Sequence, residues 1–167
     1  MKTWYMQEDP YSCALCCQGF INEQVTGEVI GEEELIETAT QKGGFIPGAG
    51  TPPEDVGKML ETMGFEINQE FGSTVEDLRD ALTEGKKIIC SVNNVALDNP
   101  LYGKLPWVHA NHAVQVIGID YTNEGKTQVI LNDPGVSGGR GRAVDVDTFE
   151  SAWKTGGRYA VTAWKGE

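Results

Sequence analysis

The chain has 167 residues and a mass of 18.2 kDa, with 40% hydrophobic and 8% aromatic residues. This length predicts a single domain over residues 1–167, and the composition excludes a generally disordered or low-complexity chain. Lys and Arg number 13 against 25 Asp and Glu, and the resulting net charge of −12 repels nucleic-acid phosphates and anionic lipid headgroups. We therefore expect neither a nucleic acid nor a membrane as a partner.

Signals for membrane insertion and for export by a cleaved leader are missing from the sequence. No run approaches the roughly 20 apolar residues that span a bilayer, and residues 1–5 lack the apolar stretch of a signal peptide. The four cysteines are too few for a disulfide scaffold, and the neighbours Cys16 and Cys17 cannot readily bridge to each other. We expect a cytoplasmic protein, or one exported without a cleavable signal peptide. The sequence indicates no oligomeric state.

The first half of the sequence carries mainly helical patterns. Apolar residues recur at helical spacing from Ser12 to about Asn22, which predicts a helix that begins near Cys13 behind turn and cap residues at Asp9, Pro10 and Ser12. Three further helices are predicted, over residues 32–42, from residue 51 to 63, and from a capping box at 73–76 to Gly85, with a strand at 65–67.

The second half carries mainly strand patterns. Strands are predicted at 87–92, 112–119 and 127–131, the last two joined as a hairpin at 123–125, and at 158–164. A short helix from a cap at Asp147 to about Lys154 interrupts them. Helices followed by a sheet predict an α+β fold.

Two segments of the second half read as loops. Residues 93–110 have no secondary-structure pattern, and loops of this length are usually lids or binding loops, so Trp107 and His109 are candidates to line a substrate cleft. The segment 135–141, which contains Arg140 and is followed by Arg142, reads as a solvated turn that could also contact an acidic or C-terminal carboxylate group.

The residue types needed for cysteine-based acyl transfer are all present. A helix N-terminus favours a thiolate, and Cys13 occupies that position. Gln7, six residues earlier, supplies a side-chain amide for an oxyanion hole. His109 and His112 are the two histidines that could act as a base, and Asp133 follows the strand after His112, where a carboxylate could orient the imidazole.

Three motifs in this order resemble one known family. The segment QEDPYSC at 7–13, the segment HAVQVIG at 112–118 and the segment LNDPG at 131–135 look like those of the bacterial papain-like peptidases that remove double-glycine leaders from bacteriocins, and of their stand-alone relatives. The closing helix with Phe149 and Trp153 also resembles that family. One departure is Ala14, because the family commonly has glycine after the nucleophile.

The resemblance implies a papain-like fold, in which an N-terminal helical part with the nucleophile helix packs on a C-terminal antiparallel sheet. It also implies roles for four residues. Cys13 would attack an acyl carbon, His112 would transfer the proton, Asp133 would orient the imidazole, and Gln7 would stabilise the oxyanion. The substrate would then be a polypeptide, and no cofactor is implied.

Simpler interpretations apply to several of these residues. Cys16, Cys17 and Cys90 are expected to be packing residues. A zinc site that uses both histidines is disfavoured, because the residues around His109 do not form a convincing helix. Asn132 could replace Asp133 as the orienting group, but strand alternation favours the aspartate, which follows the strand at its end.

Two other classes of function stay open at this point. A deamidase or transglutaminase-type effector or toxin uses the same residues through the same thioester, so the sequence does not separate it from a peptidase. A non-catalytic binding module that kept the fold is the other class. We favour a cysteine peptidase, because a degenerate copy would be expected to have lost one of the four residues. The chain contains no Walker sequence.

Overall fold

The computed structural model describes residues 4–166. The expectation that the chain lacks a signal peptide rests on residues 1–5, and the first three of these lie outside the described residues. One antiparallel sheet has the strand order β1-β6-β2-β3-β4-β5. The strands are β1 (Phe65–Glu70), β2 (Lys87–Val92), β3 (His112–Asn123), β4 (Lys126–Asn132), β5 (Arg142–Asp145) and β6 (Ala160–Lys165). The α-helices are α1 (Cys13–Thr26), α2 (Glu32–Lys42), α3 (Lys58–Thr62), α4 (Val75–Thr83) and α5 (Val146–Lys154), and the 3₁₀ helices are η1 (Pro53–Asp55) and η2 (Tyr102–Lys104).

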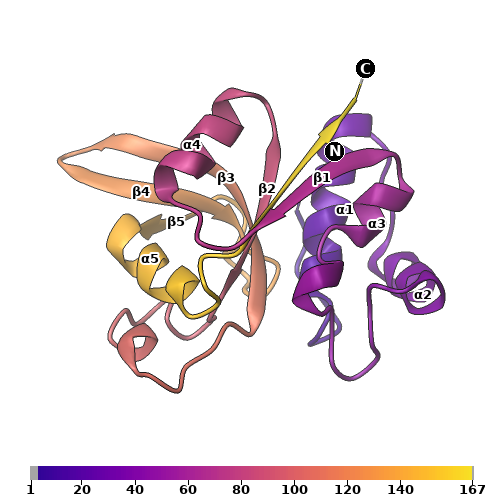
Figure 1. Cartoon of the computed structure of the whole chain (residues 1–167), viewed down its shortest axis with the longest axis horizontal. Coiled ribbons are helices and arrows are strands. Elements are labelled where there is room, and N and C mark those ends of the chain that lie inside the picture. The colour runs from indigo at the N-terminus through magenta and orange to yellow at the C-terminus, as the bar shows by residue number, and fades with distance from the viewer. Residues whose placement is uncertain (1–3, 167) are drawn as a thin grey trace.

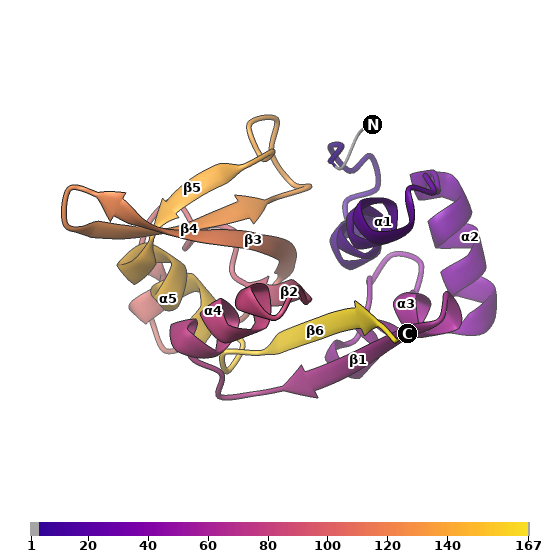
Figure 2. The ribbon, with the colours of Figure 1, turned by 90° about the horizontal axis from the view of Figure 1, so that it is seen from above.

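The helices form two groups on opposite sides of the central strands. Figure 1 shows α1, α2 and α3 together on one side, and α4 and α5 with strands β3, β4 and β5 on the other. Figure 2 shows the same separation from above, with β1 and β6 running between the groups. The expected α+β fold, with the nucleophile helix packed on an antiparallel sheet, is confirmed. No helix in the described residues is both long enough and apolar enough to cross a membrane.

Strand alternation explains why the sheet supports two cores. In β2, Ile88 and Cys90 point to the cluster that contains α4 and α5, whereas Ile89 points to the cluster that contains α1 and α3. In β3, Val114 and Ala113 divide in the same way. Both faces of β2 and β3 are therefore covered, and these two strands lie between the two halves of the molecule.

Several of the predicted elements match the structure. The helices over 32–42 and from Cys13, the strand over 87–92 and the hairpin of β3 and β4 are confirmed. The single helix predicted from 51 to 63 is wrong, because the chain forms η1 and α3 with a break at Gly57, which has a left-handed φ of 101°. A Cβ there would lie 2.9 Å from the side chain of Ile67, so both conformation and space require glycine.

Strand β5 was not expected from the sequence. Its four residues follow a glycine-rich turn and lead directly into α5, so neither length nor flanking residues separate it from a loop. The cap of α5 is consequently Asp145, whose carboxylate accepts from the backbone N–H of Asp147, and the prediction of Asp147 as the cap is wrong.

A similar shift affects the start of α4. The capping box uses Thr74 and Asp77, one residue later than the predicted pair at 73 and 76. The Thr74 hydroxyl accepts from the Asp77 N–H at 3.1 Å, and the Asp77 carboxylate accepts from the Thr74 N–H at 2.9 Å. Ser73 is instead buried, and its N–H donates to the carbonyl of Arg158.

Replacing the true cap should therefore cost more stability than replacing its neighbour. We expect Thr74→Ala to lower the free energy of unfolding by about 1 kcal/mol, because it leaves a helix-terminal N–H without its partner. The matched control Ser73→Ala keeps the backbone bond and should cost less. Urea denaturation of both variants measures this, and a larger loss for Ser73→Ala would contradict the assignment.

Candidate active site

Cys13 is the first residue of α1 and is partly exposed to solvent, whereas the other three cysteines are buried. Burial raises the pKa of the Cys16 thiol to about 12, and it also raises the pKa of Cys17 and of Cys90. These three cysteines are packing residues, as expected. Cys13 is therefore the cysteine that both reaches solvent and lies at a helix N-terminus.

The segment in front of Cys13 is held by a carboxylate of α2. Glu32 accepts hydrogen bonds from the backbone N–H groups of Glu8 and Asp9 and, at 2.6 Å, from the Ser12 hydroxyl. Ser12 thus stands at the N-cap position but donates to Glu32 instead of capping the helix, which corrects the expected cap role. Glu32 fixes the path of the chain into α1.

Helix α1 is attached to strand β3 close to its start. The Cys17 thiol, one turn after Cys13, donates to the carbonyl of Ala113 at 3.6 Å, and Ala113 is the residue next to His112. Ala14 and Ala113 belong to the same buried cluster, and small side chains at both positions permit close approach of helix and strand. The Ala14 departure is therefore compatible with the packing.

His112 and Asp133 are brought together at one end of the β3–β4 hairpin. The His112 Nε2 and the Asp133 Oδ1 lie 2.6 Å apart, and both side chains are at least nine-tenths buried. His112 opens β3 and Asp133 directly follows β4, so the antiparallel register places the two residues at the same sheet edge.

This contact sets the charge state of the imidazole. Burial by itself lowers the pKa of His112, but the hydrogen bond to Asp133 and the interaction with the Cys13 thiol outweigh it and raise the pKa to about 9. For the Asp133 carboxyl, burial by itself raises the pKa, because it disfavours the charged form. The hydrogen bond to His112 and the charge of His112 more than offset this effect, so the pKa of Asp133 lies below its ordinary value. At neutral pH the pair is imidazolium and carboxylate.

Arg142 is a second partner of the same carboxylate, a contact that the sequence did not predict. Its Nη1 donates to the Asp133 Oδ2 at 2.8 Å, and its Nη2 donates to the Asp98 carboxylate at 2.6 Å. The interpretation of Arg142 as a solvated turn residue is wrong, because it opens β5 and only 16% of its side chain is exposed. Recognising β5 as a strand would have indicated that Arg142 lies beside β4, but a strand of four residues gives little signal in the sequence.

Two glycines allow the chain to turn tightly around the Asp133 side chain. A Cβ on Gly135 would lie 2.8 Å from the His112 ring, and a Cβ on Gly139 would lie 1.8 Å from the Asp133 carbonyl oxygen. The Gly135 N–H donates to Oδ1 of Asp133, and the Asp133 N–H donates to the Gly139 carbonyl. Space therefore requires glycine at these two positions.

The N-terminal segment links the helical half to the end of β4. The Gln7 N–H donates to the carbonyl of Pro134 at 2.8 Å, and the Trp4 indole N–H donates to the carbonyl of Asp133. One hydrogen of the Gln7 amide is bound by the Asp9 carbonyl, and its buried Oε1 has no hydrogen-bond partner in the described residues. Gln7 is therefore attached to the turn that follows β4, but it is not among the residues that line the cavity described next.

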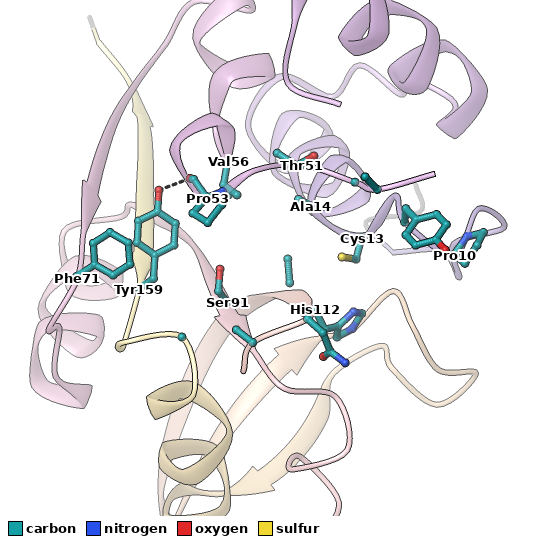
Figure 3. Close-up of a pocket in the computed structure, with 17 residues that line it drawn as sticks. Pro10, Cys13, Ala14, Thr51, Pro53, Val56, Phe71, Ser91, His112 and Tyr159 are labelled. Carbon is teal, nitrogen blue, oxygen red and sulfur yellow. Dashed lines mark hydrogen bonds between the residues drawn. The ribbon is translucent and has the colours of Figure 1, made fainter. Parts of the chain in front are cut away.

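Cys13 and His112 face each other in a cavity of about 260 Å³. Figure 3 shows the Cys13 sulfur directed towards the His112 side chain, and the cavity continuing from them to Phe71 and Tyr159. Its walls come from both halves of the molecule, with Pro53 and Val56 opposite Ser91. The site is therefore a cleft between the helical part and the sheet.

Other candidates from the sequence lie elsewhere. Trp107 is 66% exposed and His109 lies on the surface, and neither lines the cavity with Cys13, so the expectation that they line the cleft does not match the structure. The Asn132 side chain bonds to Gln115 and to the Gly141 N–H instead of to His112. Within residues 4–166 no group of three or more His, Cys, Asp or Glu side chains could hold a metal ion.

Comparison with solved structures shows that this fold is known. The peptidase domain of Streptococcus ComA, a bifunctional ABC transporter of a quorum-sensing pathway, is 17% identical, with 97% of each chain covered and a TM-score of 0.68. A protein from Bacillus anthracis described as a C39-like peptidase is 15% identical, with 99% of this chain and 96% of that chain covered and a TM-score of 0.65.

A third structure was solved with a peptide bound. It is a double-glycine-motif protease from an AMS/PCAT transporter in complex with the leader peptide, 14% identical, with 96% of this chain and 89% of that chain covered and a TM-score of 0.63. At these identities the likeness shows the fold. A comparison with curated proteins gave no match.

A family model decides the assignment. The model described as the Peptidase_C39 like family matches residues 4–161, which is most of the chain and includes all three motifs noted in the sequence. The resemblance seen in the sequence is thereby confirmed. The chain belongs to the Peptidase_C39 like family and is a papain-like cysteine peptidase.

Proposed function

We propose that this peptidase hydrolyses a polypeptide through a thioester acyl-enzyme, with Cys13 as nucleophile, His112 as proton carrier and Asp133 as orienting carboxylate. The observation that carries the proposal is the position of His112, which bonds to Asp133 through Nε2 while its ring faces the Cys13 thiol. This bond leaves Nδ1 free to exchange a proton with the thiol and with the leaving group.

The proposed reaction follows from this arrangement in two steps. In the first, the Cys13 thiolate attacks the carbonyl carbon, and the imidazolium of His112 gives its proton to the leaving amine as the C–N bond breaks. In the second, the neutral imidazole takes a proton from water, whose oxygen attacks the thioester carbon. The C–S bond then breaks, which releases the acid and restores the Cys13 thiolate beside the His112 imidazolium. Asp133 stays ionised throughout and stabilises each imidazolium.

Gln7 is the proposed oxyanion donor together with the backbone N–H of Cys13. The Gln7 amide has two hydrogens, and the Asp9 carbonyl accepts only one of them, so the second is available to a developing negative charge. The bond from the Gln7 backbone to Pro134 fixes this side chain relative to the turn that holds Asp133. The expected gain is electrostatic, because these N–H groups would donate to the developing negative charge.

A polypeptide substrate is supported by one related structure, in which a protease of the same fold binds a leader peptide. Deamidation or transglutamination would pass through the same thioester, and no contact in the described site favours them. The role as a toxin or effector has no supporting observation in the structure.

The direct test is the mass of a peptide mixture after incubation with the protein. Hydrolysis yields two fragments whose summed mass exceeds that of the peptide by one water molecule, whereas deamidation changes the mass without cutting the chain. We expect fragments, and we expect Cys13→Ser and His112→Ala each to lower the rate by at least about a hundredfold. The matched control His109→Ala removes a histidine outside the cavity and should retain the rate.

Two outcomes of that experiment would contradict the proposal. One is cleavage that persists in folded Cys13→Ser protein. The other is a larger loss for His109→Ala than for His112→Ala.

The raised pKa of His112 predicts a pH dependence. Acylation needs the imidazolium as the acid, so kcat/KM should fall as pH rises through about 9, where His112 loses its proton. Asp133→Asn removes the hydrogen bond that raises this pKa, so the alkaline limb should move to lower pH. Asn132→Ala is the matched control, because that side chain contacts Gln115, and its limb should stay in place. A shift with Asn132→Ala alone would move the orienting role to the asparagine.

A further inference from the structure

The end of the cavity remote from Cys13 is formed by two aromatic side chains that the proposed chemistry does not use. The rings of Phe71 and Tyr159 have centroids 4.5 Å apart and planes tilted by 32°. Tyr159 is almost fully buried, and its hydroxyl donates to the carbonyl of Pro53. Figure 3 shows both rings lining the same cavity as Cys13 and His112, with the Tyr159 hydroxyl bonded to Pro53.

Phe71 is unusual because its ring is exposed although its backbone is fixed. The side chain is 66% exposed. The chain around it is held by two hydrogen bonds, from the Gly72 N–H to the Gly157 carbonyl at 2.8 Å and from the Ser73 N–H to the Arg158 carbonyl at 3.2 Å. An aromatic ring that is held at the mouth of a cavity offers apolar surface to a ligand at a small entropic cost.

Most side chains that line the cavity carry no charge. Apart from His112, the residues that line it include no acidic or basic side chain, in a chain whose net charge is −12. Two of the lining residues, Gly156 and Ala110, pack closely against each other, since a Cβ on Gly156 would lie 2.7 Å from the Cβ of Ala110. An uncharged space with aromatic and aliphatic walls favours an apolar group and disfavours an ionised one.

We infer that the Phe71–Tyr159 pair forms a substrate subsite at the end of the cavity remote from Cys13, and that this subsite takes the bulky, uncharged apolar side chain of a residue that neighbours the bond that Cys13 attacks. This inference rests on the proposed function, because it assumes that the peptide lies along the cavity next to Cys13. A substrate with glycine at every position near the cleaved bond would have no side chain to contact Phe71 and Tyr159. The enzyme should therefore discriminate in favour of a large apolar residue.

Peptidyl chloromethyl ketones test the subsite without knowledge of the natural substrate. In these reagents the thiolate displaces chloride and forms a thioether, so the rate of loss of free Cys13 thiol reports how well the peptide is bound. We would compare an acetyl-triglycine reagent with three reagents that carry one phenylalanine at each position in turn, and with the corresponding glutamate reagents. One phenylalanine reagent should react about tenfold or more faster than the triglycine reagent, and its glutamate counterpart should not.

Variants of two equally exposed aromatic residues identify the surface responsible. Phe71→Ala should lower the rate with the preferred phenylalanine reagent several-fold, and it should leave the rate with iodoacetamide unchanged. Trp107→Ala is the matched control, because Trp107 is also 66% exposed but lies outside the cavity, and it should change neither rate.

The subsite is overturned if the triglycine reagent reacts as fast as every phenylalanine reagent, or if Trp107→Ala removes the preference as strongly as Phe71→Ala. Either result leaves the peptidase proposal intact when Cys13-dependent hydrolysis has been observed. Conversely, a preference for phenylalanine that depends on Phe71, in a protein that cuts no peptide, supports the subsite and contradicts the hydrolytic function.

Discussion

The site depends on one buried carboxylate, that of Asp133. A carboxylate with 2% exposure is costly unless its oxygens are paired, and here Oδ1 faces the His112 Nε2 and accepts the Gly135 N–H while Oδ2 accepts from Arg142. Each partner comes from a different segment, so the side chain also defines how β3, β5 and the turn after β4 meet. Arg142 also donates a hydrogen bond to the Asp98 carboxylate, and this bond attaches the long loop after β2 to the same site. The imidazolium that a cysteine peptidase needs is a consequence of this arrangement.

The cleft exists because two separately packed halves meet along β2 and β3. The contact from Cys17 to Ala113 holds α1 against β3, and the bond from Gln7 to Pro134 joins the same halves on the other side of the site. Both contacts lie close to Cys13, His112 and Asp133. Phe71 lies at the other end of the cavity and takes part in neither contact, and we assign it to substrate selection.

The sequence predicted the parts of the site that local patterns specify. The turn and apolar residues around Cys13 predict the helix, the β-branched run after His112 predicts the strand, and the end-of-strand position of Asp133 follows from alternation along β4. The bond from Arg142 to Asp133 was not predicted, because a four-residue strand after a glycine-rich turn has no distinctive pattern. Trp107 lies outside the cavity that contains Cys13, and the sequence could not show this, because a loop without periodicity gives no information on which way its side chains face.

The most direct test of this account is the titration of His112 followed by NMR of its imidazole nitrogens in the intact protein. The account predicts a pKa of about 9 for His112 and a lower value in Asp133→Asn, because the carboxylate stabilises the cation. It also predicts that Nε2 keeps its proton across the titration, since that nitrogen donates to Asp133. A His112 pKa near its ordinary value of about 6.5, unchanged by Asp133→Asn, would contradict the central role given to the carboxylate.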